Sequence, residues 1–427
     1  MERGHLLELL QNGALLPHLE PVYGPDAAEA GRRLRELVLE YAGTFPSPDT
    51  ADTWLFSTPG RAELGGSHTD HQHGRGLASA VNLDTIACVV PNDTGVIRVK
   101  SRGHRMASAD LGNLSIQEAE TGNSPALVRG VAARLRQLGY AIGGFDAYTT
   151  SIVPRGGGLS SSAAFEVLVA TIMNHLFCGG SLSPLQTAQT ALYAENVYFG
   201  KPSGLLDQLA CATGGVIAAD FQNPQEPQVR RLPLDLDALG YALCIMDTRA
   251  SHASLIDDFS AIPREMADAA AYFGEKTLRT VSYERFLQEL PQVRAACGDR
   301  AVLRAYHFFQ EDRRVLRQCE ALEQGDFGTF LRCARASGRS SFMYLQNVSN
   351  HKDSRFQPLA LLQALAEELL EDTGAVRVHG GGFAGTVEAF VPLERLDRFV
   401  QGMEDMAGRG SCHVIRLRSA GSVLLAH

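Results

Sequence analysis

The feature that most constrains the fold is VPRGGGLSSSAAFEVLVATIMNHLF at residues 153–177, where glycines and serines separate two regular elements. The preceding stretch FDAYTTSIV, residues 145–153, is rich in β-branched and aromatic residues and predicts a strand. After the loop, Val167, Leu168 and Ile172 fall on one stripe of a predicted helix. The chain therefore combines strands and helices, and an all-β fold is excluded.

This glycine–serine loop (residues 156–162) has the composition of an anion site. Glycine lets the backbone approach an anion closely, and the free N–H groups of the first helical turn then hold it. The candidate phosphate-binding residues are Gly156, Gly157, Gly158, Ser160, Ser161 and Ser162. A serine hydroxyl can also ligate a magnesium ion. The loop is not a Walker A loop, because the chain contains no G-x-x-x-x-G-K-[ST]. A serine-capped helix after a plain glycine turn is the alternative.

The length of 427 residues favours two closely packed domains. The stretch FQNPQEPQVRRLPLDLD at 221–237 has three prolines and no helical period, and it is the best candidate for their junction. We therefore expect an amino-terminal domain at residues 1–228 and a carboxy-terminal domain at 229–427.

The charge balance limits the partners. Lys and Arg number 39 against 48 Asp and Glu, the formal charge is −9, and no Lys/Arg-rich run occurs. Nucleic acid and anionic membranes are therefore not expected as partners. The eight cysteines are scattered without a Cys-x-x-Cys pair, which predicts reduced thiols in a cytoplasmic protein. No apolar stretch reaches the ~18 residues that a membrane span needs, and we expect a monomer.

A second glycine cluster, HGGGFAGTVEAFVP at 379–392, contains the G-x-G-x-x-G spacing of a dinucleotide loop. Such a loop must open a helix, whereas TVEAFV is β-branched and apolar and predicts a strand. We expect close backbone packing near the glycine–serine loop, with an ordinary turn as the alternative.

Ionisable side chains are concentrated in STPGRAELGGSHTDHQHG, residues 57–74. They are Arg61, Glu63, His68, Asp70, His71 and His73. One interpretation is a metal site of a hydrolase, since H-x-D-H-x-H offers four ligands, although no second cluster completes the shell. The other is a polyol site, where Asp and His bind hydroxyls while Arg61 meets phosphate. A solvated loop is the third alternative.

A candidate base lies in AENVYFGKPSGLLDQLACATGG, residues 194–215. Asp207 falls within the apolar helical run LLDQLACA, and a carboxylate there is costly to bury unless it is paired. Asp207 is thus either a helix-start residue facing water or a positioned base. Glu195 is either a magnesium ligand or a solvated helix residue.

Taken together and in this order, these segments resemble the GHMP kinase superfamily and, within it, the galactokinases. The matching segments are PGRAELGGSHTDHQHG, PRGGGLSSSAA, ENVYFGKPSGLLDQ and HGGGFAG, with RAYHFFQEDRRV at 304–315 as a fifth. The resemblance covers about residues 55–425. It implies a two-domain α+β fold, with a left-handed β-α-β unit in the amino-terminal domain, a ferredoxin-like carboxy-terminal domain, and ATP and sugar between them.

The resemblance also implies roles for single residues. Asp207 and Arg61 match the catalytic pair, and Asp207 would orient and deprotonate the anomeric hydroxyl. His68, Asp70 and the backbone at Gly204 match positions that hold the sugar hydroxyls. The glycine–serine loop would bind the triphosphate, with Ser161 and Glu195 at Mg²⁺. Positioning and electrostatics would supply most of the rate.

Three segments depart from the galactokinase pattern. Ser67 stands where these enzymes usually carry Glu, and Phe259 aligns with the usual sugar-contacting tyrosine, so both are expected to contact substrate. SGRSSFMYLQNV replaces an acidic segment. The predicted activity is ATP-dependent phosphorylation of the C1 hydroxyl of galactose. The alternatives are the same chemistry on an arabinose, an N-acetylated amino sugar or a uronic acid, a catalytically silent sugar and ATP sensor, or a metallohydrolase.

Overall fold

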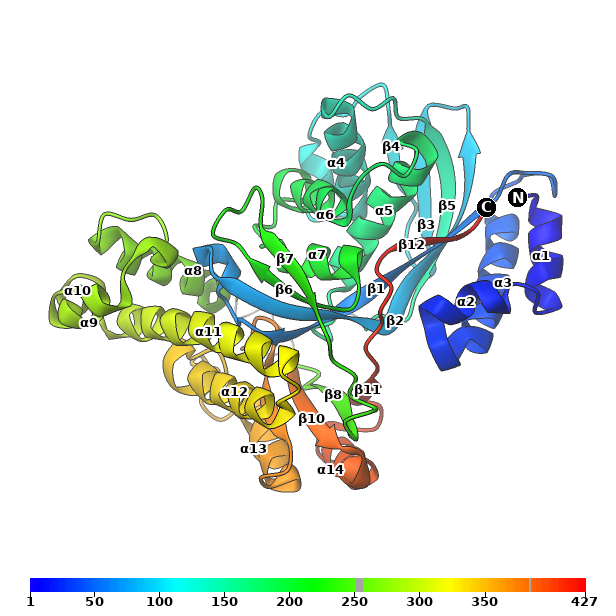
Figure 1. Ribbon diagram of the computed structural model, residues 1–427. Helices are drawn as coiled ribbons and strands as arrows, with labels where there is room; N and C mark the ends of the chain where they lie inside the picture. Colours follow the sequence, from blue (N-terminus) through cyan, green and yellow to red (C-terminus); the bar gives the residue numbers. More distant parts are fainter. Residues whose placement is uncertain (155, 251–255, 384) are drawn as a thin grey trace.

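The chain folds into two sheets surrounded by helices (Figure 1). The computed structural model describes residues 1–154, 156–250, 256–383 and 385–427. Within them, the first sheet consists of β1 (Trp54–Gly65), β2 (Arg75–Asn92), β3 (Val96–Ser101), β4 (Ala107–Asp110), β5 (Gly144–Ser151), β6 (Val216–Asp220), β7 (Gln228–Leu232) and β12 (Val423–Ala426). Its main path runs β12-β1-β2-β5-β3-β4, while β6 pairs with the first part of β2 and β7 pairs with β6.

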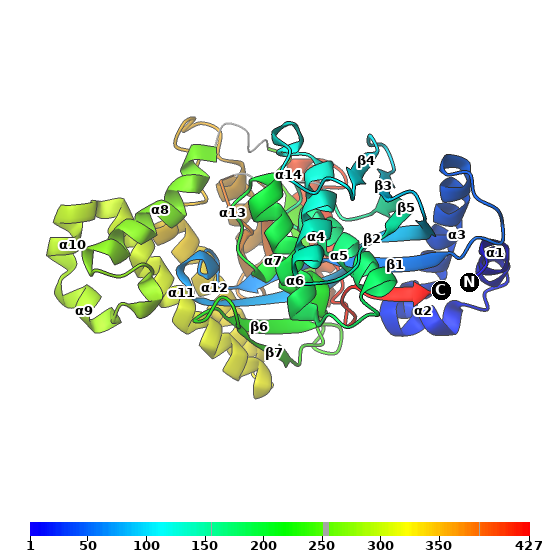
Figure 2. The same cartoon turned by 90° about the horizontal axis from the view of Figure 1, so that it is seen from above.

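Helices cover both faces of this sheet (Figures 1 and 2). They are α1 (Arg3–Gln11), α2 (Leu16–Tyr23) and α3 (Ala27–Thr44) on one face, and α4 (Ser124–Gln137) and α5 (Ser161–Phe177) on the other. Successive residues of a strand point to opposite faces. Leu55 of β1 accordingly packs in the apolar cluster of α1–α3, and its neighbour Phe56 packs in the cluster of α4 and α5. Two further helices, α6 (Pro184–Tyr193) and α7 (Leu206–Thr213), pack against α5 and carry the chain toward β6.

The predicted β-α-β unit corresponds to β3 and β5, which run parallel and are joined through β4 and α4. Its left-handed connection stays a prediction. The strand expected at 145–153 is β5 and the helix expected after the glycine–serine loop is α5, so this central expectation is confirmed.

The second sheet consists of β8 (Tyr241–Asp247), β9 (Ala375–His379), β10 (Thr386–Pro392) and β11 (Cys412–Ile415). Its order is β11-β8-β10-β9 and every pair is antiparallel. With helices between β8 and β9 and between β10 and β11, this is the β-α-β-β-α-β arrangement of a ferredoxin-like domain. One face packs on α13 (Pro358–Leu370) and α14 (Leu396–Ala407).

The other face of this sheet packs on α11 (Asp299–Glu323) and α12 (Phe327–Ser340). The long α11 continues outward to α8 (Ile256–Tyr272), α9 (Tyr283–Gln288) and α10 (Leu290–Cys297), with which it shares an apolar cluster. Both views place α9 and α10 at one end of the molecule and α1–α3 at the other (Figures 1 and 2). Of the helices in the described residues, none is both long and apolar enough to cross a membrane.

The sheets divide the chain slightly differently from the expected boundary at residue 228. Strand β7 runs across that position and pairs with β6, and the last strand, β12, returns to pair with β1. Pro227 and Pro233 flank β7, which suits an edge strand because proline lacks the N–H needed inside a sheet. The division into two domains at residue 228 therefore stays a proposal, and the gap between the sheets falls between Leu232 and Tyr241.

Candidate active site

A cavity of about 530 Å³ lies where β1, the β1–β2 loop (residues 66–74), the segment before α7 and the first part of α8 meet Gly380 and Gly381. The predicted site residues that line it are Arg61, His68, Asp70, Gly204, Asp207 and Phe259. A larger cavity of about 730 Å³ lies between α2 and β11, and no predicted site residue lines it. Residues expected to act together, although far apart in sequence, therefore share one cavity.

Arg61 and Asp207 form a bidentate ion pair at this cavity. The Arg61 Nε lies 2.7 Å from Asp207 Oδ1, and Arg61 Nη2 lies 2.8 Å from Oδ2. Ser160 donates its hydroxyl to the same Asp207 Oδ2. Burial alone would raise the pKa of Asp207, but the Arg61 guanidinium and the Ser160 hydroxyl more than offset it, so the pKa lies below its usual value. Asp207 lies in the first turn of α7 with 35% of its side chain exposed, and the contacts with Arg61 and Ser160 hold it as an ionised, firmly oriented carboxylate.

The glycine–serine loop connects directly to this pair. Arg61 donates from Nη1 to the carbonyl of Gly158, and its backbone N–H donates to the carbonyl of Leu159 over 3.1 Å. A Cβ on the preceding Gly60 would lie 2.7 Å from that carbonyl, so the strand approaches the loop this closely only with glycine there. The loop and Arg61 are thereby held side by side.

Within the loop, the three serines have different surroundings. Ser160 adopts the left-handed conformation, φ 53°, immediately before α5, and its hydroxyl is occupied by Asp207. Ser161 and Ser162 begin α5, where free N–H groups face outward, and Ser162 is exposed. Gly156 is also exposed. The accessible anion-binding groups are therefore the glycine backbone and the first turn of α5.

On the opposite side of the cavity, His68 is held by the second glycine cluster. Its Nε2 donates to the carbonyl of Gly381 over 3.1 Å, and its ring contacts Phe259 edge-on at 5.6 Å between centroids. Burial lowers the pKa of His68 to about 4 and that of His71 to about 3, so both rings are neutral at pH 7. The HGGGFAG segment thus contacts the β1–β2 loop through Gly381, and it also packs near the glycine–serine loop as expected, since a Cβ on Gly158 would lie 2.7 Å from His379 Nδ1.

Asp70 faces the same cavity beside Gly204. One of its oxygens accepts the backbone N–H of His71 over 2.8 Å. Burial, followed by the charges of Asp207 and Glu63, raises the pKa of Asp70 to about 6. A Cβ on Gly204 would collide with Asp70 Oδ2, so the two segments touch only because residue 204 is glycine. Asp70 and Gly204, which were both expected to hold sugar hydroxyls, therefore lie side by side at the cavity.

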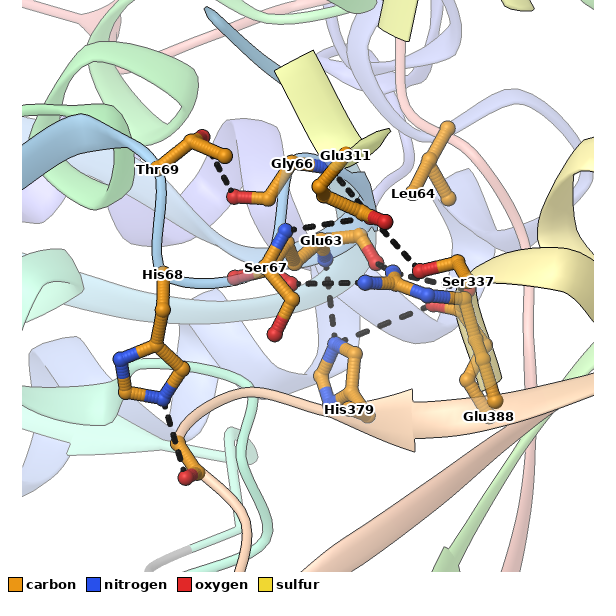
Figure 3. A network of polar contacts seen from close by, with 12 residues as sticks. Glu63, Leu64, Gly66, Ser67, His68, Thr69, Glu311, Ser337, His379 and Glu388 are labelled. Carbon is orange, nitrogen blue, oxygen red and sulfur yellow. Dashed lines mark hydrogen bonds and ion pairs between the residues drawn. The ribbon is translucent and has the colours of Figure 1, made fainter. Parts of the chain in front are cut away.

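Ser67 lies behind the cavity wall. It is fully buried and does not line the cavity, and its hydroxyl contacts no polar partner among the described residues. Glu311 of α11 accepts the N–H groups of Gly66 and Ser67 over 3.2 and 3.4 Å (Figure 3). His307 Nε2 donates to the Ser67 carbonyl over 3.0 Å. Helix α11 therefore fixes the backbone of the β1–β2 loop, and a direct contact of Ser67 with substrate stays a prediction.

Glu195 lies in a short π-helix, Ala194–Phe199, after α6. It is buried, and its oxygens accept from Lys201 Nζ at 2.7 Å and Gln208 Nε2 at 2.8 Å. Gln208 also reaches the buried Glu166, whose other oxygen has no partner among the described residues. The carboxylate oxygens of Glu195 suit Mg²⁺, a cation that prefers oxygen ligands. The half-exposed Lys201 that now contacts them is itself a cation, and Mg²⁺ can replace it.

Four further ionisable residues line the cavity without a role assigned to them from the sequence, namely Glu63, His71, His73 and Lys201. Glu63 was recognisable in principle, because residues two apart on a strand share a face and Arg61 precedes it by two. Lys201 carries no local signal, since a lysine in a loop is usually solvated. The described residues contain no group of three His, Cys, Asp or Glu side chains that could hold a metal ion, and the hydrolase alternative finds no support in them.

Two family models match this chain. Residues 126–215 match the GHMP kinases N terminal domain, and residues 40–91 match the galactokinase galactose-binding signature. The first includes the glycine–serine loop and Asp207, and the second includes Arg61, His68 and Asp70.

Individual proteins are similar over nearly the whole chain. A galactokinase of Streptomyces coelicolor is 32% identical over 384 residues, which is 89% of this chain and 92% of that protein. The crystal structure of Lactococcus lactis galactokinase complexed with galactose superposes with a TM-score of 0.78 at 25% identity, covering 92% of this chain and 99% of that one. A mevalonate kinase of Methanococcus jannaschii shares the fold, with a TM-score of 0.59 at 14% identity over 86% and 98% of the two chains.

Proposed function

Because the chain belongs to the galactokinase family of the GHMP kinases, we propose that it transfers the γ-phosphoryl group of ATP to the C1 hydroxyl of galactose. The observation that carries this proposal is the Arg61–Asp207 pair, which lies between the glycine–serine loop and the cavity that Asp70 and His68 line. Phosphoryl donor and sugar acceptor thus have adjacent sites.

Asp207 is proposed to orient the C1 hydroxyl. Its lowered pKa keeps it ionised, so it accepts the hydroxyl hydrogen bond at once but is a weak base. In a loose phosphoryl-transfer transition state, the attacking hydroxyl needs little deprotonation and much alignment. The role that this geometry favours is therefore positioning of the hydroxyl, with proton transfer following as the new bond forms.

Arg61 is proposed to act on both sides of the reaction. One edge of its guanidinium holds Asp207 and another holds the Gly158 carbonyl, so it fixes the acceptor group relative to the glycine–serine loop. Its positive charge next to the loop also offsets charge that accumulates on the transferred phosphoryl group. The backbone N–H groups at the start of α5 would hold the phosphates of ATP.

Mg²⁺ would be held by the Ser161 hydroxyl and the Glu195 carboxylate, as the resemblance implies. When bound, this ion neutralises phosphate charge and fixes the phosphate geometry. For Glu195 to take part, Lys201 must leave its 2.7 Å contact. Lys201 then lies at the cavity with a charge free to meet phosphate.

Asp70 and His68 are proposed to hold the sugar hydroxyls, with Phe259 against the sugar ring. Asp70 accepts hydroxyl hydrogen bonds when ionised, and the neutral His68 presents Nδ1 as an acceptor because its Nε2 hydrogen is directed to Gly381. Galactose is favoured over arabinose, an amino sugar or a uronic acid by the matched galactose-binding signature. A silent sensor is not favoured, because Arg61, Asp207 and the serines are all in place. A monomeric, cytoplasmic protein stays a prediction.

The test is an ADP-release assay with ATP and a panel of galactose, glucose, arabinose, N-acetylgalactosamine and galacturonate. We expect galactose to give the highest kcat/KM and the product to be galactose 1-phosphate. Turnover of another panel sugar far above galactose would overturn the substrate while leaving the kinase activity in place. Absence of ADP release with every sugar would overturn the kinase activity itself.

A further inference from the structure

Glu63 is a carboxylate of the cavity with no role assigned so far. It lies two residues after Arg61 on β1, and both side chains line the same cavity. Its charge acts on both other carboxylates there, since it contributes to the raised pKa of Asp70 and is itself influenced by Asp207. Glu63, Asp70 and Asp207 therefore surround one space.

The Glu63 side chain is held from behind by the second sheet (Figure 3). Arg377 of β9 donates from Nη2 to Glu63 Oε1 over 2.9 Å and from Nη1 to the Glu63 carbonyl. The backbone N–H of Glu63 donates to His379 Nε2 over 3.1 Å. The other carboxylate oxygen, Oε2, accepts no hydrogen bond from any described residue. Glu63 is thus fixed in place with one acceptor unused.

The charges around Arg377 favour its ion pair with Glu63. Arg377 also lies 3.6 Å from Glu388 of β10, but burial raises the pKa of Glu388 to about 8, so that carboxyl is mostly protonated at pH 7. The charge of Arg377 is then directed to Glu63, where it opposes the effect of burial on the Glu63 pKa. Burial still prevails, so the pKa of Glu63 lies above its usual value, and Arg377 is the contact that favours its charged form.

The cationic side chains that line the cavity are already engaged. Arg61 is paired with Asp207, and Lys201 is paired with Glu195. Of the lining histidines, burial lowers the pKa of His68 to about 4, that of His71 to about 3 and that of His73 below its usual value. A substrate carboxylate would therefore face Glu63 and Asp70 while Arg61 is held by Asp207, and the Lys201 charge, once Mg²⁺ takes its place at Glu195, is directed to phosphate.

We propose that Glu63 is a specificity-determining residue of the sugar site, whose free oxygen accepts a substrate hydroxyl and whose charge excludes sugars that carry a carboxylate. This inference rests on the proposed function of the same cavity and narrows its substrate class to neutral sugars with free hydroxyls. Two observations support this proposal. Arg377 anchors one Glu63 oxygen, and the Glu63 side chain lines the cavity.

The experiment compares wild type with Glu63→Gln for galactose and galacturonate, with ATP varied separately. Gln keeps the size but replaces a charged acceptor, so we expect KM for galactose to rise about tenfold while kcat and KM for ATP change less than about twofold. The ratio of kcat/KM for galactose to kcat/KM for galacturonate should fall by a similar factor or more. An unchanged galactose KM together with an unchanged preference would overturn the proposal.

Glu388→Gln is the matched control, because Glu388 contacts the same Arg377 but does not line the cavity. We expect its kinetics to stay within about twofold of wild type. Equal losses in the two variants would show that Glu63 acts only through the integrity of the buried cluster, which overturns the proposal. Should Glu63→Gln fail to fold, Glu63→Asp keeps the charge, and it must still exclude galacturonate if the proposal holds.

The sugar preference of the wild-type protein distinguishes failure of this inference from failure of the proposed function. If wild type prefers another panel sugar, the galactokinase proposal fails, and the Glu63 comparison is made with that sugar against its carboxylate analogue. A wild type that turns over galacturonate best would overturn both.

Discussion

Gly204 and Asp70, from segments 134 positions apart, touch so closely that any side chain at residue 204 would displace the Asp70 carboxylate. Asp70 lines the cavity that we propose for the sugar, whereas the glycine–serine loop, which we propose for ATP, contacts another edge of Arg61. We therefore expect Gly204→Ala to raise KM for galactose at least about tenfold and to leave KM for ATP nearly unchanged. Steady-state kinetics with galactose and ATP varied in turn measures the two KM values.

The control for that variant is Gly43→Ala. Gly43 lies in helix α3, far from the cavity, and a Cβ there would meet nothing within 4 Å. Wild-type kinetics are expected for Gly43→Ala. Equal KM values for galactose in Gly204→Ala and wild type would show that the contact with Asp70 does not position the sugar.

Asp207→Asn tests the catalytic pair. Asn keeps the shape but not the charge, so the C1 hydroxyl loses its ionised acceptor and Arg61 is left buried without its partner. We expect kcat to fall at least ~10²-fold while ATP affinity changes little. Both quantities should be measured on one folded preparation, with thermal unfolding as the check on folding. Turnover close to wild type would remove Asp207 from the reaction.

The sugar affinity is expected to depend on pH through Asp70. Its pKa is raised to about 6 by burial, so the carboxylate becomes protonated as the pH falls below 6 and then loses acceptor capacity. The pKa of Asp207 lies below its usual value, so Asp207 stays ionised over the same range. We predict that KM for galactose rises between pH 7 and pH 5 while kcat falls less. In Asp70→Asn this rise should be absent, and its persistence there would assign the titration to another group.

The buried Glu388 is expected to make the free energy of unfolding depend on pH. Its pKa is raised from 4.5 to about 8 in the folded chain by burial, so the folded state keeps a proton that the unfolded state has lost. The stability that this neutral form contributes is complete below pH 4.5 and is lost as the pH rises through 8. We expect Glu388→Gln to become more stable relative to wild type as the pH increases from 5 to 9. Urea unfolding of both proteins at pH 5, 7 and 9 checks this, and a constant difference would contradict it.

Ser67 provides a test of what the β1–β2 loop tolerates. The side chain is fully buried and its hydroxyl has no polar partner among the described residues, so Ser67→Ala should unfold close to the wild-type temperature. Ser67→Glu would bury an additional carboxylate beside Glu311 and should lower the melting temperature by several degrees or prevent folding. Differential scanning calorimetry separates the two. A raised galactose KM in Ser67→Ala would instead show that the hydroxyl reaches the substrate.

Much of the architecture was predictable from local pattern. The strand, loop and helix at residues 145–177 follow from periodicity and turn chemistry, which act over a few positions. The spacing of Asp70 from His68 and the charge of Asp207 in an apolar helix likewise mark them within short windows. Four such windows in one order were enough to indicate the family.

The expectation for Ser67 shows the limit of that reasoning. A loop of nine residues between Gly65 and Arg75 can turn any one side chain inward or outward, and nothing local decides which. Glu311 and His307, more than 230 positions away, fix the loop backbone and leave the hydroxyl behind the cavity wall.

The sequence by itself determined the secondary structure around the glycine–serine loop and which residue types could perform phosphoryl transfer. Only the tertiary structure decided which of these residues contact one another. Arg61 reaches Asp207 across 146 positions, and Arg377 reaches Glu63 across 314. Such contacts leave no periodic signal, because they depend on how the second sheet and α11 pack against β1. Packing also sets the burial that shifts the pKa of Asp70 and Glu388, and so it decides which carboxyl groups are charged at pH 7.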